Sequence, residues 1–122
     1  MGGAACLLIA GKQTMLATAA FVLSWSHSVE KTAWQEQWVV RGDGLQLVEA
    51  RVKGSGAGMD PGDGARLEDG WWIWPVDAPA ISRLVLASSG ATAGGWRLCH
   101  DGGCRTIGAE PGPPVTLEPC GK

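Results

Sequence analysis

The chain has 122 residues, with 19 Gly and 7 Pro, and its aromatic residues are 7 Trp, 1 Phe and no Tyr. A net charge of −2 without any run of Lys or Arg lacks the electrostatic footprint of nucleic-acid binding. With 45% hydrophobic residues the chain is not a disordered tail, and its Gly and Pro content disfavours a helical bundle. We therefore expect one all-β domain over residues 1–122, an antiparallel β-sandwich or barrel of about 8–10 short strands.

The first apolar run, Ala4–Ala10, predicts a strand rather than a targeting or membrane segment. No positively charged region precedes it, as a signal peptide requires. Gly11-Lys12-Gln13-Thr14 then ends the run well short of the ~18–20 residues of a spanning helix. The chain as given is expected to carry no export signal of its own and not to span a membrane.

Turn-forming residues recur at short intervals along the rest of the chain and predict strands between them. The ten expected strands are Ala5–Ala10, Ala20–Ser26, Ala33–Val40, Leu45–Lys53, Ala65–Leu67, Trp71–Trp74, Ser82–Ala87, Gly95–His100, Cys104–Ile107 and Val115–Glu118. Gly42-Asp43-Gly44, Asp69-Gly70 and Asp101-Gly102 are expected to close hairpins, because Asp and Gly tolerate the positive φ of primed turns. A short helical turn inside Ser28–Trp38 is the one alternative to strand.

The four cysteines are Cys6, Cys99, Cys104 and Cys120. If Asp101-Gly102 form a turn, Cys99 faces Cys104 across the hairpin at a distance that a disulfide accepts. Cys6 and Cys120 would then join the two ends of the chain. Free buried thiols are the next interpretation, and a zinc site that uses Cys99, Cys104 and His100 is the least favoured, because there is no second close pair of cysteines.

Two disulfides imply an oxidising compartment. We therefore expect an extracytoplasmic location, periplasmic or membrane-associated. A cytoplasmic location stays open, because no clear signal peptide is present in the chain as given.

The densest polar segment is Ser24-Trp25-Ser26-His27-Ser28-Val29-Glu30. His27, oriented by Glu30 or Glu36, is a candidate general base or metal ligand. On a strand, however, Ser28 points away from His27, so the two do not form a catalytic dyad. The favoured interpretation is a histidine packed against Trp, and a hydrolase built on His27 and Ser28 is the weakest.

The Gly-rich segment Lys53–Met59 follows a strand but lacks the Gly-Lys-Ser/Thr ending of a phosphate-binding loop and the helix that should come next. We expect a tight loop whose small residues let the backbone approach other backbone or a ligand. A backbone-lined nest for a small anion stays open.

The seven Trp divide into two groups. Trp71, Trp72, Trp74 and Trp96 are expected to be core and hairpin aromatics, because the chain has no Tyr and one Phe and Trp must supply the aromatic volume. An exposed aromatic patch at Trp71, Trp72 and Trp74 stays open. Trp25, Trp34 and Trp38 flank the polar segment around His27.

Several segments resemble a small bacterial family. They are Phe21–Thr32 running into Trp34 and Glu36, Leu47–Met59, Asp69-Gly70-Trp71-Trp72, Leu98-Cys99 and Cys104-Arg105. Together they are similar to the domain of unknown function 1850. The resemblance implies an association with TRAP-type solute transporters of the TAXI class, whose permeases import organic anions such as dicarboxylates. No catalytic mechanism comes with it.

The resulting expectation is a non-enzymatic accessory protein of a TRAP/TAXI-type uptake system, without a cofactor, that contacts the permease, its solute-binding protein or a small ligand. The surface residues that the family motifs indicate are His27, Ser28, Glu30, Trp34, Glu36, Gly54, Ser55, Gly56, Gly58 and Met59. The alternative is a module that binds a metal or a small anion through His27, Glu30, Glu36 and the loop Gly54–Met59.

Overall fold

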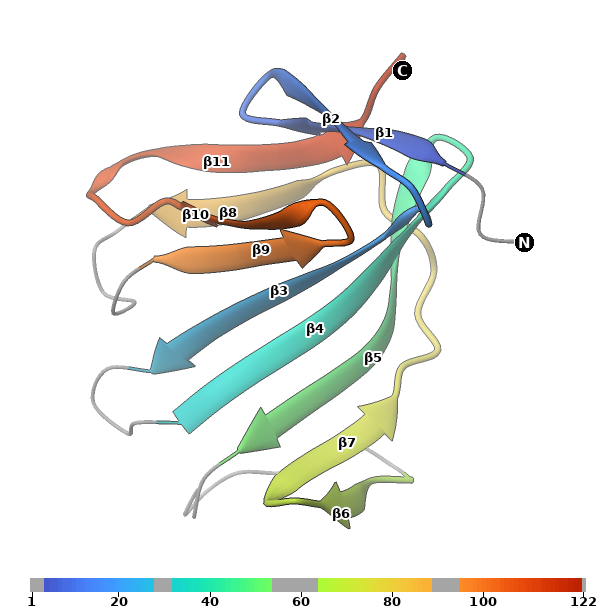
Figure 1. Cartoon of the computed structure of the whole chain (residues 1–122), viewed down its shortest axis with the longest axis vertical. Helices are drawn as coiled ribbons and strands as arrows, with labels where there is room; N and C mark the ends of the chain where they lie inside the picture. Colours follow the sequence, from blue (N-terminus) through green and yellow to red (C-terminus); the bar gives the residue numbers. More distant parts are fainter. Residues whose placement is uncertain (1–3, 28–31, 54–63, 89–94, 122) are drawn as a thin grey trace.

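The computed structural model describes residues 4–27, 32–53, 64–88 and 95–121, with the backbone alone of His27. Its strands form two antiparallel sheets that pack face to face, so the fold is a β-sandwich rather than a closed barrel (Figure 1). The smaller sheet has the order β2-β1-β11-β8, with β1 at Ala5–Ile9, β2 at Lys12–Leu16, β8 at Leu84–Ser88 and β11 at Gly112–Pro119. The larger sheet has the order β10-β9-β3-β4-β5-β7-β6.

The seven strands of the larger sheet are β3 at Ala20–His27, β4 at Thr32–Arg41, β5 at Gly44–Lys53, β6 at Arg66–Glu68, β7 at Trp71–Pro75, β9 at Trp96–His100 and β10 at Gly103–Ile107. The expected all-β fold is therefore confirmed, and the segment from Thr32 onward is a strand rather than a helical turn. Among the described residues, no helix has the length and apolarity needed to cross a membrane.

The three expected hairpins all form. Asp69 and Gly70 link β6 to β7 with φ of 51° and 85°, the positive values that a type I′ turn needs at both central residues. Gly42-Asp43 joins β4 to β5, and Asp101-Gly102 joins β9 to β10.

The sequence analysis missed β2, which pairs with β1 across a turn at Ala10-Gly11. This strand lies at the edge of the smaller sheet, and of its five residues only Leu16 is buried, so its pattern reads as polar loop. At the other end of the chain, β11 begins at Gly112, three residues before the expected strand Val115–Glu118, and so includes Pro113 and Pro114. A register shift between Gly112 and Val115 accommodates the two prolines, which cannot donate to a regular ladder.

The hydrophobic core lies between the two sheets. It consists of Leu7, Ile9, Leu16, Phe21, Leu23, Trp38, Leu45, Leu86, Leu98, Ile107 and Leu117. Eight of these side chains are less than 2% exposed, which leaves an apolar interior built mainly of Leu. The buried side chains thus come from both sheets and hold them together.

Trp71, Trp72 and Trp74 lie in a hairpin as expected but not in the core, and Trp38 belongs to the core. Trp38 is 6% exposed and stacks on Phe21 in the core, whereas Trp71, Trp72 and Trp74 are half-buried and lie outside it. Trp71, Trp72 and Trp74 lie outside the core because β7, the strand that carries them, is away from the smaller sheet (Figure 1). Trp96 is only partly buried, but it packs against the core as Trp25 does.

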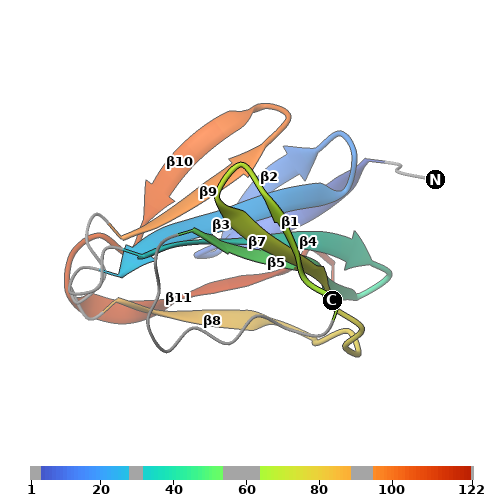
Figure 2. The same ribbon diagram turned by 90° about the horizontal axis from the view of Figure 1, so that it is seen from below.

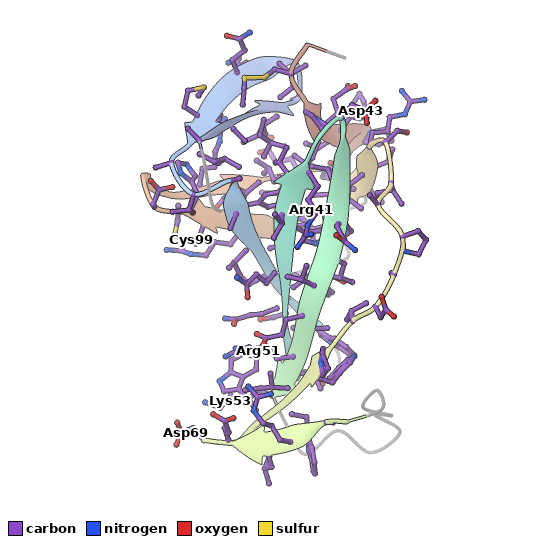
Figure 3. All side chains as sticks on the ribbon, turned by 90° about the vertical axis from the view of Figure 1, so that its right-hand side faces the viewer. Arg41, Asp43, Arg51, Lys53, Asp69 and Cys99 are labelled. Carbon is purple, nitrogen blue, oxygen red and sulfur yellow. A yellow bond between two sulfur atoms is a disulfide. The ribbon has the colours of Figure 1, made fainter. Side chains whose placement is uncertain are left out.

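The strand in question, β7, lies with β6 at the margin of the larger sheet, away from the four-stranded sheet (Figures 1 and 3). We call β6 and β7 the projecting edge. Figure 2 shows β8 and β11 on one side of the larger sheet, with the β9–β10 hairpin tilted toward the other side. The larger sheet therefore has an inner face, which contacts the smaller sheet, and an outer face.

Both expected disulfides are present, Cys6–Cys120 and Cys99–Cys104. Cys99 and Cys104 are direct partners in the β9–β10 register, as the turn at Asp101-Gly102 predicts. The Cys120 amide also donates to the Cys6 carbonyl at 3.0 Å, which joins the chain ends at the smaller sheet. All four sulfur atoms are paired, so the zinc alternative that uses Cys99 and Cys104 is wrong.

Candidate functional site

The two longest family-like segments meet at one end of the larger sheet. Ser26 in β3 pairs with Ala33 in β4, Ala33 pairs with Lys53 in β5, and Lys53 pairs with Trp71 in β7. These four residues form one row across four neighbouring strands. Residues that are 45 positions apart in sequence, Ser26 and Trp71, are thereby brought into a single row of the sheet.

Seven of the ten surface residues expected from the sequence have no described position. Ser28, Glu30, Gly54, Ser55, Gly56, Gly58 and Met59 lie outside the described residues. The backbone of His27 pairs with Thr32 at the end of β3. Trp34 and Glu36 are described, and both belong to the inner face, because they pair with Trp25 and Leu23 of the core side.

Glu36 is a half-buried carboxylate among apolar side chains. Its register neighbours are Leu23 in β3 and Ala50 in β5, both buried. Burial raises the pKa of Glu36 above its usual value, and the hydrogen bond that Trp38 Nε1 donates to Oε1 at 3.1 Å opposes part of that shift. The carboxylate therefore faces the core and orients the Trp38 indole.

Trp34 extends the aromatic packing of the core toward the end of the sheet that carries the row Ser26, Ala33, Lys53 and Trp71. Its ring stacks on Trp25 with centroids 6.2 Å apart, and Trp25 contacts Trp96 at 4.9 Å. Aromatic contacts of this kind add to the energy of burial itself. Trp34 thus packs on Trp25 at an inner-face position of the register, and it also lines the hollow described next.

The outer face carries a shallow hollow of about 370 Å³, of whose lining residues the sequence had indicated Trp34 as a surface residue. It is lined by Ser24, Trp25, Ser26, Ala33, Trp34, Gln35, Trp71, Gly95, Arg97 and Thr106. We call it the outer-face hollow. Most of these residues share one face by register, since Thr106, Arg97, Ser24 and Gln35 form one row and Ser26, Ala33 and Trp71 belong to the next. Alternation along β3 could have placed Ser24 and Ser26 together, but Arg97 and Thr106 come from strands whose pairing partner the sequence did not reveal.

The positive charges near the outer-face hollow have different surroundings. Arg51 donates to Glu49 at 2.8 Å, so its charge is already matched. Lys53 places Nζ 5.7 Å from the centroid of the Trp71 ring. Arg97 is exposed, and no carboxylate of the described residues lies within ion-pair distance of it. Figure 3 shows Arg51 and Lys53 on the same side of the sheet as Cys99, which is the outer face.

The described residues offer no group of three His, Cys, Asp or Glu side chains placed to hold a metal ion. The metal alternative depends on Glu30, which lies outside the described residues, and on the side chain of His27, which is not described.

Comparison with known proteins identifies the family. A family model described as "Domain of unknown function (DUF1850)" matches residues 21–107, which is more than half of the chain. The chain therefore belongs to the DUF1850 family. Neither a curated protein nor a solved structure matches it.

The matched region includes β3 from its second residue and all of β4 to β10, and so the row from Ser26 to Trp71 and every lining residue of the outer-face hollow. It leaves out β1, β2 and β11, which build most of the smaller sheet.

Proposed function

We propose that this protein is a non-enzymatic accessory protein of a TRAP/TAXI-type solute uptake system, and that it acts by contact with the permease or its solute-binding protein. The contact surface is the end of the larger sheet that carries the row Ser26, Ala33, Lys53 and Trp71. The transport partner rests on the family resemblance, and the position of the surface rests on the sheet register.

The observation that carries the proposal is the row Ser26, Ala33, Lys53 and Trp71. If each family-like segment only stabilised its own strand, there would be no reason for segments that are far apart in the sequence to meet in the fold. Their meeting at one sheet end is expected if they make one surface. A half-buried Trp beside a Lys is also a suitable anchor, because interfaces bury aromatic side chains at their centre.

The proposal is tested by co-purification of tagged protein with the neighbouring transport proteins in mild detergent. Wild-type protein is expected to retain the permease or the solute-binding protein. Lys53→Glu is expected to lose it, because the substitution reverses the charge at the centre of the row and removes the cation that covers Trp71.

Lys12→Glu is the matched control, because Lys12 is an exposed lysine in β2 of the smaller sheet, outside the family match. This variant should retain the partner as wild type does. If neither transport protein is retained by wild type, or if Lys53→Glu and Lys12→Glu behave alike, the proposal is wrong. Metal analysis of the purified protein, with a thermal-shift screen of divalent ions, tests the metal alternative separately.

A further inference from the structure

We infer that the outer-face hollow binds a small organic carboxylate that carries a flat apolar group. It names a ligand for the binding function proposed above. It rests on the protein acting by binding, and it does not depend on the transport partner.

The shape of the hollow comes from a contrast in side-chain size. Ser24, Ser26 and Ala33 lie on adjacent strands, which are about 4.8 Å apart in a sheet, and they provide a floor of short side chains. Arg97 and Trp71 stand on strands at either side of this floor. A volume of about 370 Å³ is within the range of small-molecule sites in proteins.

The charge of the hollow selects an anion. Arg97 lines it, and none of the described lining residues is acidic. Arg51, in the same row of the sheet, is paired with Glu49, whereas the guanidinium of Arg97 has no carboxylate partner among the described residues. A planar guanidinium matches the two oxygens of a carboxylate in a bidentate pair.

The remaining lining residues select the rest of the ligand. The hydroxyls of Ser24, Ser26 and Thr106 and the amide of Gln35 can donate to carboxylate oxygens beside Arg97. Trp71 offers an aromatic surface that is half-buried, with Lys53 Nζ over its ring. A flat apolar group stacks well on such a surface, and a neutral sugar would leave Arg97 without a partner.

The experiment is a titration of the whole chain with benzoate, followed by calorimetry and by the melting temperature. Benzamide has the ring without the charge, acetate has the charge without the ring, and inorganic phosphate and glucose represent the other ligand classes. We expect benzoate to bind and to raise the melting temperature, and each of the other four to bind at least about tenfold more weakly, because each lacks one of the two contacts.

Two pairs of variants locate the site. Arg97→Gln and Trp71→Leu should each weaken benzoate binding by about tenfold or more. Their controls are Arg105→Gln and Trp72→Leu, which change the same residue types on the same two hairpins but at positions that face the other side of the sheet. The controls should bind benzoate as wild type does, and circular dichroism confirms that each variant is folded.

The inference is overturned if wild type does not bind benzoate, if phosphate or glucose binds as tightly as benzoate, or if Arg97→Gln and Trp71→Leu bind it unchanged. The co-purification experiment can fail while benzoate still binds, in which case the transport partner is wrong and the ligand site stands. If benzoate fails but the transport partner is retained, the contact surface stands and the hollow is not a carboxylate site.

Discussion

The covered part of the larger sheet and its projecting edge obey the same strand alternation but differ in what they bury. Leu23 in β3 is 0% exposed, because its side chain points toward the four-stranded sheet. Leu67 in β6 is 57% exposed, although the register of β6, β7 and β5 places it on the same inner face. These two leucines differ because the second sheet extends over β3 and not over β6, although one residue of the projecting edge, Ile73, is buried on the outer face at 3% exposed.

Aromatic side chains lie on both faces of the projecting edge, and each of them is only half-buried. Trp72 and Trp74 share the inner face, and Trp71 lies on the outer face. Large half-buried aromatic residues at the margin of a sheet contribute less to stability than core residues, and they are available for binding. We therefore assign stability mainly to the covered part, and we propose binding at the row from Ser26 to Trp71 and at the projecting edge.

The largest expected effect concerns the disulfide that fastens the covering sheet. Cys6–Cys120 closes a loop with a sequence separation of 114, whereas Cys99–Cys104 spans 5. The chain-entropy model predicts a loss of about 5 kcal/mol for Cys6→Ser/Cys120→Ser and about 2 kcal/mol for Cys99→Ser/Cys104→Ser. Urea unfolding of both double variants checks the order, and an equal loss in both would contradict it.

Leu23 and Leu67 test whether the covered part is packed more tightly than the projecting edge. Leu23→Ala should destabilise the protein by about 3 kcal/mol, because it leaves a cavity in the core. The same substitution at exposed Leu67 should cost no more than about 0.5 kcal/mol. Urea unfolding gives both values, and similar losses would show that the projecting edge is as tightly packed as the covered part.

Sequence alone predicted the architecture well, because turns and alternation are local signals. Gly42-Asp43, Asp69-Gly70 and Asp101-Gly102 each specify a turn through their own backbone preferences, and the Cys99–Cys104 pair follows from the last of them. Only the edge strand β2, with one buried side chain, gave too weak a pattern.

The site could not be predicted to the same extent, because it depends on non-local pairing. Arg97 and Ser24 are direct neighbours through the pairing of β9 with β3, two strands separated by most of the chain. No local pattern near either residue encodes that neighbour. The same limit explains the assignment of the Trp residues, since alternation places Trp72 on the inner face but does not tell where the second sheet ends.

Substitution of Trp38 and of Trp72 tests which of the two belongs to the core, with an effect of intermediate size. Trp38→Leu should cost about 2 kcal/mol, because Trp38 is 6% exposed, stacks on Phe21 and is replaced by a smaller side chain. Trp72→Leu, on the same inner face but in the projecting edge, should cost about 1 kcal/mol or less. Thermal unfolding of the two variants checks the difference, and a larger loss at Trp72 would restore the original assignment of this residue to the core.

The smallest expected effect concerns Glu36, which lies in one row between buried Leu23 and Ala50, where the covered part approaches the projecting edge. Because burial raises its pKa, the folded protein holds this proton more tightly than the unfolded chain does. The stabilisation that results is present below the usual pKa of Glu and is lost as the pH rises through the raised value.

Glu36→Gln does not titrate, and its amide oxygen can still accept from Trp38 Nε1. The melting temperature of the variant should therefore rise relative to wild type between about pH 4 and pH 8, by a few degrees at most. Parallel profiles over this range would show that Glu36 is as well solvated as a residue of the outer face, and the boundary between the two regions would then lie closer to β3.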